Sequence, residues 1–242
     1  MAKILDITVD LETLSLTPNA AILQIAAVAW RRDAEDTPFF LTHWRDEDGS
    51  EHVKMTEHYT FDNVIDLRSC VALNMDFDQK TIDWWSRQRQ EVKAAVLSDD
   101  HFDYILSEAL NSFMAWAAEL ASELDEKGCS LRLWSQGSDF DIAILRNACH
   151  KCGLTEQFDR VFPYASFRDA RTFILELGKA VTYPFFPLSN TVDVRPSGIY
   201  QALPPFEGEN LTHDALYDCE KTSWAVWSVM KAHALHYPEA EE

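Results

Sequence analysis

Basic residues are scarce in this chain, whereas acidic residues are abundant. Lysine and arginine number 21 against 40 aspartate and glutamate residues, which gives a formal net charge of -19 at pH 7. Because neutralisation of phosphates by lysine and arginine dominates nonspecific affinity for nucleic acid, this balance excludes a protein that coats nucleic acid nonspecifically. It leaves open an enzyme that acts on nucleic acid, because bound divalent ions reverse the local charge of an acidic cluster.

Long hydrophobic runs and a cysteine framework are also missing. No apolar run approaches the roughly 20 residues needed to cross a bilayer, and the first residues lack the hydrophobic segment of a signal peptide. Five cysteines at irregular positions fit a reducing compartment better than a set of disulfides. Cys149 and Cys152 have no second pair with matching spacing, as a four-ligand structural zinc site would need. We therefore expect a cytoplasmic protein that does not enter the membrane.

The composition is that of a folded protein with one sizeable core. The chain has 242 residues, 47% of them hydrophobic, and no internal repeat or interdomain linker stands out. We predict a single domain over residues 1–237. It would contain an inserted helical region at about 77–127 and a proline-rich loop at about 181–210, and an acidic tail would follow at 238–242.

Hydrophobic periodicity predicts a mixed α/β fold. Residues 3–10, 20–30 and 37–44 read as three strands of an antiparallel meander, the second interrupted only by Gln24. Strands followed by helices interleaved with a short strand give a central sheet covered by helices. The helical patterns cover residues 78–90, 101–127, 138–152 and 167–180 and a last segment capped by Thr212, and the short strand covers 131–135.

Two acids near the end of the first strand are the first candidate site. Asp10 and Glu12 are two residues apart, so a strand directs both side chains to one face, where the two carboxylates repel unless a cation lies between them. Mg2+ and Mn2+ are the natural candidates because they prefer oxygen ligands. The plain alternative is a solvated strand end, since acids are mostly exposed.

Three further polar residues lie at predicted helix starts. Asp141 follows the strand at 131–135, although with Asp139 it would equally complement a helix dipole. His213 and Asp218 open the last helix, and their spacing brings them together only if that helix begins beside the sheet edge. A surface histidine and an ordinary first-turn acid are the alternative.

Taken in order, these residues resemble the motifs of a known family. Asp10-x-Glu12, Phe140-Asp141 and His213-x4-Asp218 are similar to the three motifs of the DEDDh 3'-to-5' exonucleases, members of the RNase H-like superfamily. Residues 10–28, 81–88 and 134–145 look like the exonuclease VIII branch, although Gln136-Gly137-Ser138 stands where many relatives have an asparagine before the second acid. The resemblance implies an RNase H-like mixed sheet, an antiparallel meander plus parallel strands, flanked by helices.

The resemblance also implies a two-metal hydrolase. Asp10, Glu12, Asp141 and Asp218 would hold two Mg2+ or Mn2+ ions, which serve the attacking and leaving oxygens of a phosphodiester when roughly 4 Å apart. His213 would be the general base, because its unperturbed pKa of about 6.5 lets it accept a proton near neutral pH.

Substrate contacts are implied as well. The backbone near Thr13 and the side chain of Leu14 would meet the terminal nucleotide, although Leu14 would serve equally as a core residue. Arg168 and Arg171, spaced to share a helical face, would contact phosphates or pair with nearby acids. Trp84 would stack on an unpaired base or pack in the core.

These observations predict a divalent-metal-dependent 3'-5' exonuclease. It would release nucleoside 5'-monophosphates from the 3' end of single-stranded or frayed DNA or RNA. The alternatives are a catalytically silent nucleic-acid or protein-binding module of the same fold, and a small-nucleotide phosphodiesterase. A homodimer is open, because eight tryptophans would either form an exposed contact face or fill one core.

Overall fold

The computed structural model describes residues 3–46, 48–97, 104–124, 129–185 and 213–236. Its centre is a five-stranded mixed sheet with the order β5-β2-β1-β6-β7. The strands run β1 Ile4–Thr13, β2 Ile22–Trp30, β5 Thr60–Val64, β6 Ser130–Ser135 and β7 Phe167–Asp169. Strands β1, β2 and β5 are antiparallel neighbours, whereas β6 is parallel to β1 and to β7. The predicted α/β fold class, with antiparallel and parallel strands in one sheet, is confirmed.

Strand β1 separates apolar from polar side chains by simple alternation. The odd-numbered residues from Leu5 to Leu11 belong to the larger hydrophobic core. The even-numbered residues face the opposite side, because successive side chains of a strand point to opposite faces. These even-numbered residues are Asp6, Thr8, Asp10 and Glu12.

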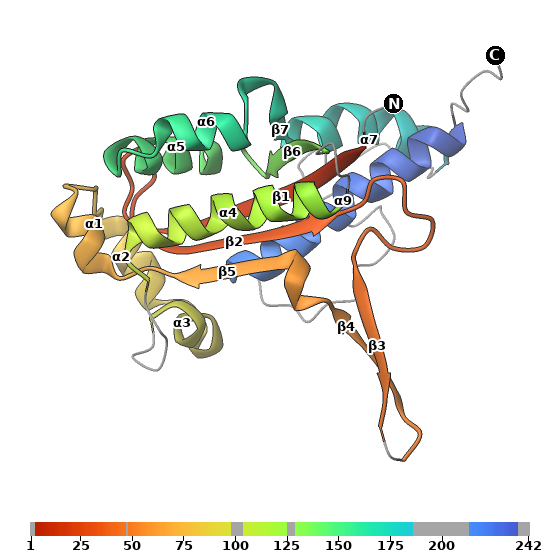
Figure 1. The fold of residues 1–242 in the computed structure, drawn as a ribbon, viewed down its shortest axis with the longest axis horizontal. Coiled ribbons are helices and arrows are strands. Elements are labelled where there is room, and N and C mark those ends of the chain that lie inside the picture. The colour runs from red at the N-terminus through yellow and green to blue at the C-terminus, as the bar shows by residue number, and fades with distance from the viewer. Residues whose placement is uncertain (1–2, 47, 98–103, 125–128, 186–212, 237–242) are drawn as a thin grey trace.

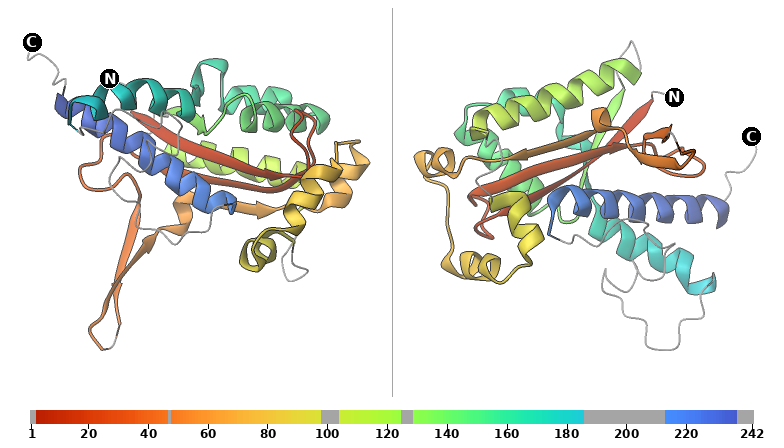
Figure 2. Two further views of the ribbon diagram at one scale, coloured as in Figure 1. Left: turned by 180° about the vertical axis from the view of Figure 1, so that it is seen from behind. Right: turned by 90° about the horizontal axis from the view of Figure 1, so that it is seen from below.

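Helices cover both faces of the sheet, so each set of β1 side chains has a partner layer. On the odd-numbered face lie α4 Leu106–Leu124, α5 Asp141–Lys151 and α6 Thr155–Val161, whose apolar residues join the larger core. On the other face lie α7 Ala170–Phe185 and α9 Ala215–His236 (Figures 1 and 2).

The face covered by α9 holds its polar side chains through hydrogen bonds. Ser223 of α9 donates from Oγ to Oγ1 of Thr8 at 2.8 Å, and Trp30 donates from Nε1 to the same oxygen at 2.9 Å. Asp6 is fully buried and accepts bonds from Arg32 and from Nε1 of Trp134. The polar side of β1 is therefore paired along its first half, and Asp10 and Glu12 follow.

Short helices occupy the end of the molecule at which β1 turns into β2. These are α1 Leu67–Ala72, α2 Gln79–Ser86 and α3 Gln90–Leu97. Two short 3-10 turns lie elsewhere in the chain, η1 Glu57–Tyr59 before β5 and η2 Tyr164–Ser166 before β7. Helix α2 is tied to the end of β1, because Trp85 donates from Nε1 to the carbonyl oxygen of Thr13 at 3.0 Å.

The strand predicted at residues 37–44 is present from Leu41 onward, but its place as the third strand of the meander is wrong, because this segment meets β2 in an isolated bridge between Phe39 and Trp30. Strand β3 Leu41–Arg45 pairs instead with β4 Glu51–Met55 in a separate ribbon that projects from the body (Figure 1). The chain reverses near Gly49, whose positive φ of 88° suits glycine. Strand β5 takes the third place, and its Thr-Phe-Asp-Asn-Val sequence concealed it because an edge strand needs few apolar residues.

Three predicted helices have different limits. The pattern at 78–90 contains α2 and reaches only the first residue of α3. Helix α4 begins after Tyr104, which forms a bridge with Ile65. Residues 101–103 and 125–127 of the longest pattern lie outside the described residues. Helix α5 begins at Asp141 rather than at Ser138, because Ser138 donates its backbone N–H and its hydroxyl to Asp169 and so is held outside the helix.

The predicted helix at 167–180 begins with a strand. Its first three residues form β7, and α7 then continues to Phe185, into the segment predicted as a proline-rich loop. Arg168 lies on the strand and Arg171 on the helix, so the prediction that they share a helical face is wrong. Thr212, residues 186–212 and the acidic tail lie outside the described residues.

Among the described residues, no helix combines the length and the apolar character needed to cross a membrane.

Gln24 joins α9 to the sheet and offers a test of this arrangement. Its Oε1 accepts the backbone N–H of Ala215 at 3.2 Å, and its Nε2 donates to Asp62 at 2.8 Å. Gln24→Met keeps the volume and removes both bonds, so we expect a loss of about 1 to 3 kcal/mol in unfolding free energy, measured by urea denaturation. The exposed Gln79→Met, which breaks a bond to Asp83, should change it by less than about 0.5 kcal/mol. Equal effects of the two substitutions would contradict this role of Gln24.

Candidate active site

A cavity of about 280 Å³ opens where β1, the segment after β6 and the start of α9 meet. Its wall contains six of the eight residues predicted as site residues from the sequence. These six residues are Asp10, Glu12, Asp141, Arg171, His213 and Asp218. Residues from four segments of the chain, separated by up to about two hundred positions in sequence, therefore meet in one place.

Strand alternation and the position of α9 bring the first carboxylates together. Asp10 and Glu12 lie on the α9 side of β1, and Glu12 is the register partner of Gln24 on β2. Since Gln24 also binds the first turn of α9, that helix begins directly beside Glu12. Ligand atoms of Glu12, His213 and Asp218 lie within 4.8 Å of one another.

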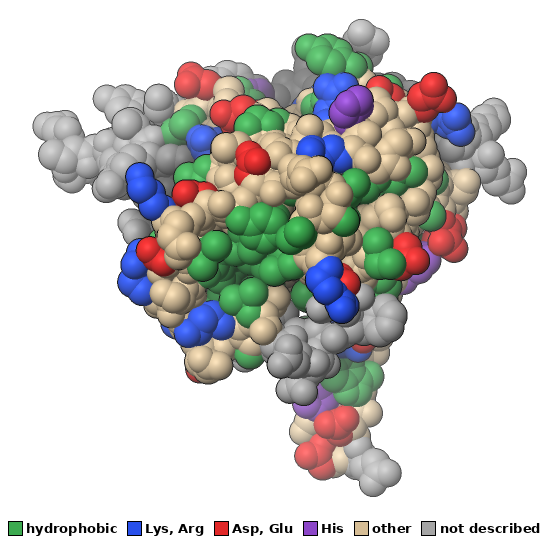
Figure 3. All heavy atoms as spheres, turned by 90° about the vertical axis from the view of Figure 1, so that its left-hand side faces the viewer, with side chains coloured by type: hydrophobic (Ala, Val, Ile, Leu, Met, Phe, Trp, Pro, Cys, Tyr) green, Lys and Arg blue, Asp and Glu red, His purple; other side chains and the backbone are tan. Residues whose placement is uncertain are grey.

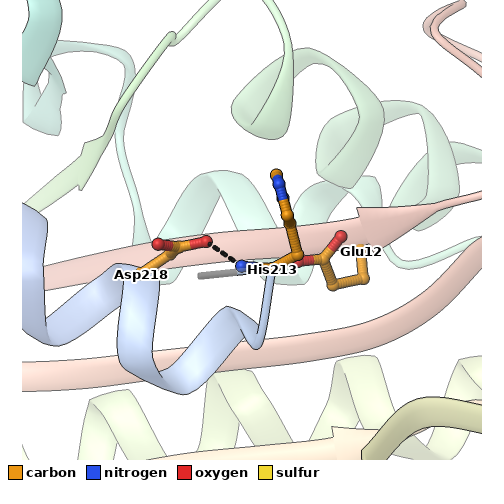
Figure 4. A group of neighbouring side chains, drawn as sticks. All are labelled: Glu12, His213 and Asp218. Atoms are coloured by element: carbon orange, nitrogen blue, oxygen red, sulfur yellow. Dashed lines mark hydrogen bonds between the residues drawn. The ribbon is translucent and has the colours of Figure 1, made fainter. Parts of the chain in front are cut away.

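His213 and Asp218 lie side by side, as their spacing required of a helix that starts at the sheet edge. The backbone N–H of His213 donates to Oδ2 of Asp218 at 2.9 Å, and His213 lies between Glu12 and Asp218 (Figure 4). His213 has a positive φ of 76°, a conformation that a residue with a side chain adopts only when its surroundings hold it there.

Asp141 enters the cavity from the first turn of α5. It is buried, and the backbone at Leu11 and Gly137 lies close enough to oppose the rise in its pKa. Arg171 approaches from α7, and a Cβ atom on Gly137 would lie 3.1 Å from its Nη2. Glycine at 137 therefore leaves room for the guanidinium beside the acid.

Burial raises the pKa of all four carboxyl groups. Desolvation is the largest cause in each case. Neighbouring acids add to it, so the pKa of Asp10 lies well above its usual range and that of Glu12 rises to about 9. Burial raises the pKa of Asp141 to about 7, against the opposing effect of its backbone bonds and of Arg171. The His213 N–H opposes the rise in the pKa of Asp218.

The donor set fits divalent cations that prefer oxygen. Four carboxylates facing one cavity repel one another, and a positive ion between them would remove that repulsion. Oxygen-rich sites of this kind suit Mg2+ and Mn2+ better than softer metals. The site can therefore concentrate positive charge inside a strongly acidic protein.

A second cavity adjoins the first and shares Leu11, Glu12 and Phe140 with it. Thr13 lines this second cavity, together with Leu16, Asp78, Lys80, Thr81, Trp84 and Trp85. Leu14 does not reach either cavity in this conformation, because it is 6% exposed and packed in the hydrophobic core. Leu16, which is 74% exposed, lines the second cavity instead.

Several residues of the site have little signal in the sequence. The first cavity is also lined by Gln136, Lys221 and Thr222, and Lys221 adds a positive charge three residues after Asp218 on α9. Asp214 raises the pKa of Asp10 and Glu12 and accepts the backbone N–H of Tyr217 in the first turn of α9. An aspartate immediately before a helix is a capping signal that sequence reading could have used.

Comparison with known proteins identifies one matching family. The family model described as "3'-5' exoribonuclease Rv2179c-like domain" matches residues 5–230. Among solved structures, the chain is similar to cell-death related nuclease 4 (CRN-4), with 15% sequence identity and a TM-score of 0.48. That similarity covers 96% of this chain and 64% of the length of CRN-4. Among curated proteins, none matches the chain.

The raised pKa values predict how pH acts on the metal-free protein. A carboxyl group with a raised pKa binds its proton more tightly in the folded than in the unfolded state, so its stabilising contribution is complete below the unfolded pKa of about 4. That contribution is lost as pH rises through about 7 for Asp141 and about 9 for Glu12. We expect the melting temperature in EDTA to fall across this range.

Asp10→Asn should relieve the repulsion and raise the melting temperature in EDTA at pH 8. We expect roughly 2 to 4 °C, the shift that about 1 kcal/mol gives in a chain of this size. Differential scanning fluorimetry checks this, with exposed Asp33→Asn as the matched control. A melting temperature that rises with pH in EDTA, or an Asp10→Asn variant no more stable than Asp33→Asn, would refute the electrostatic account of the cavity.

Proposed function

The chain belongs to the 3'-5' exoribonuclease Rv2179c-like domain family, and from this premise we propose that it is a 3'-5' exonuclease that shortens single-stranded RNA from the 3' end with two divalent metal ions. The observation that carries the proposal is that Asp10, Glu12, Asp141, His213 and Asp218 all line one cavity. The products would be nucleoside 5'-monophosphates.

The four carboxylates would hold the ions. Asp141, Glu12 and Asp218 all repel Asp10, so we assign Asp10 to both ions, Glu12 and Asp218 to one, and Asp141 to the other. When bound, a pair of Mg2+ or Mn2+ ions would supply an activated water molecule and neutralise charge that gathers on the phosphate. The raised pKa values support this assignment, because each acid needs a nearby positive charge to ionise fully near neutral pH.

His213 would act as the general base. Its backbone is held by Asp218, and its ring lies beside Glu12, so a water molecule placed by the acids would lie within reach of an imidazole nitrogen. A neutral imidazole can accept the proton of that water near pH 7. Arg171 and Lys221, which also line the cavity, would hold the phosphate oxygens.

The second cavity would receive the nucleotide at the 3' end. Thr13 lines the second cavity and follows Glu12, which both cavities share, so we assign its backbone to the terminal 3' hydroxyl, and Leu16 and Trp84 offer apolar surface for a base. We assign the side-chain contact with the terminal nucleotide to Leu16 rather than to Leu14, because Leu16 is exposed and Leu14 is buried. Figure 3, which views the end that carries α1 and α2, shows a hollowed apolar surface with both basic and acidic side chains around it.

RNA is the proposed substrate because the family description names a 3'-5' exoribonuclease. The presence of all five motif side chains in one cavity argues against a catalytically silent binding module. Continuity of the two cavities favours a strand over a small nucleotide. The exonuclease VIII branch, the DEDDh motif assignment, the single domain over residues 1–237, a homodimer and a cytoplasmic location all stay predictions.

A labelled-end assay tests the activity and its polarity. Purified protein is incubated with 5'-labelled and 3'-labelled single strands of RNA and DNA, with Mg2+, Mn2+ or EDTA. We expect a ladder of shortened 5'-labelled RNA and immediate release of label from 3'-labelled RNA, in either metal but not in EDTA. Shortening from the 5' end, or RNA cleavage that continues in EDTA, would refute the proposal. Faster loss of DNA than of RNA would correct the substrate.

Two substitutions separate metal binding from proton transfer. Asp10→Asn should reduce kcat by more than about 1,000-fold and weaken Mn2+ binding in isothermal titration calorimetry, because it removes the acid assigned to both ions. His213→Asn should reduce kcat by roughly 100- to 10,000-fold, the usual size of a general-base effect, with Mn2+ affinity little changed. Equal Mn2+ affinities in the two variants would show that these roles are misassigned.

Arg171→Met tests the phosphate contact. Loss of a charge-assisted hydrogen bond should raise the KM for RNA by roughly 10- to 100-fold with a smaller effect on kcat. The control is Arg168→Met, three residues away on β7, where the guanidinium donates to the carbonyl oxygens of Ala165 and Phe167. If both variants raise KM equally, the effect comes from overall charge and not from the cavity.

A further inference from the structure

We propose that Trp84 is a positioning residue for the reaction, one that holds the imidazole ring of His213 beside the carboxylates. The inference rests on the proposed function and names a residue that acts through His213 rather than on the reacting atoms. It has its own physical observation, a ring contact between two segments far apart in the sequence.

The contact itself is a perpendicular aromatic pair. The rings of Trp84 and His213 have centroids 4.7 Å apart and an interplanar angle of 89°. Edge-to-face packing of this kind is a favoured geometry for aromatic rings and fixes both the distance and the tilt of the partner. Trp84 comes from α2, and His213 precedes α9.

His213 needs such a support because its backbone alone does not fix its ring. The positive φ of 76° and the bond from its N–H to Asp218 determine where the Cα lies. Rotation about the side-chain bonds would still carry the imidazole away from Glu12. The indole ring limits that rotation.

Trp84 is itself held in place by the end of β1. Its ring packs against Trp85 at 5.3 Å and 83°, and Trp85 is 2% exposed and bonded to the carbonyl oxygen of Thr13. The first turn of α2 is capped by Asp78, which accepts the N–H of Thr81. The end of β1, which carries Glu12, therefore holds Trp85 by a hydrogen bond, Trp85 packs against Trp84, and Trp84 contacts the ring of His213.

A competing role for Trp84 is that of a surface on which a base stacks, since Trp84 also lines the second cavity. The two roles differ in their kinetics. A positioning residue contributes to the transition state and its loss lowers kcat, whereas loss of a stacking surface raises KM. Misplacement of a catalytic group by about 1 Å costs up to roughly 100-fold in rate.

The experiment compares three variants on 5'-labelled single-stranded RNA with saturating Mn2+. Trp84→Met keeps much of the volume without an aromatic ring, and Trp84→Phe keeps a ring. The matched control is Trp44→Met, because Trp44 also contacts a histidine: its ring stacks on that of His52 with centroids 5.1 Å apart. Both residues lie on the projecting β3–β4 ribbon and line neither cavity. We expect Trp84→Met to lower kcat by roughly 10- to 100-fold with KM within about twofold. Trp84→Phe should recover most of the loss, and Trp44→Met should match the parent protein.

Histidine NMR gives a second readout that a merely structural role would not change. The ring resonances of His213 should shift in Trp84→Met and not in Trp44→Met, and those of His52 should show the reverse. A raised KM with unchanged kcat would overturn the proposal in favour of base stacking. Unchanged kinetics would overturn it altogether, as would equal loss of kcat in Trp84→Met and Trp84→Phe.

The parent protein keeps the inference testable if Trp84→Met does not fold. Nuclear Overhauser contacts between the rings of Trp84 and His213 should then be observed in the parent protein, and their absence overturns the inference. Failure of the proposed function is distinguished by the parent protein as well, because it would then show the ring contact without any metal-dependent shortening of RNA.

Discussion

The arrangement of this protein depends on one strand that is buried on both faces and polar on one of them. The odd-numbered side chains of β1 enter the main hydrophobic core, whereas the even-numbered ones face α9. Each buried polar group on that side must find a partner, because an unpaired polar group in the interior is strongly destabilising. Asp6 is paired with Arg32 and Trp134, and Thr8 with Trp30 and Ser223. Asp10 and Glu12 end the row, and Asp141 and Asp218 add two further acids beside them.

That concentration of carboxylates is what gives the site its chemistry. Acids that destabilise one another in the metal-free protein would form a strong site for cations under the proposed function, so stability and function would compete at the same residues. The rest of the fold holds the competing groups in place. Gln24 ties the start of α9 to β2, Gly137 leaves space for Arg171, and the tryptophan pair of α2 connects the end of β1 to His213. Each of these contacts joins elements that are distant in the sequence.

The sequence was sufficient for the parts that depend on local pattern. Alternation placed Asp10 and Glu12 on one face, and a central sheet covered by helices followed from the order of the predicted elements. Local pattern failed where long-range pairing decides. Strand β5 has one buried residue, Phe61, and gave no apolar alternation, so residues 37–44 took its place in the prediction. Nothing local distinguishes Leu14 from Leu16, whose exposures of 6% and 74% are set by the packing of the β1–β2 connection. The contact of Trp84 with His213 joins residues that are far apart in the sequence, and no local pattern predicts it.

The central claim is that the cavity between β1, α5 and α9 is a site for two divalent ions. A crystal structure of the His213→Asn variant grown with Mn2+ tests it most directly, because manganese is located independently by its anomalous scattering. The account predicts two manganese peaks in the cavity, both in coordination contact with Asp10, one of them shared with Glu12 and Asp218 and the other with Asp141. Full-occupancy manganese elsewhere on the protein, with the cavity empty, would contradict it.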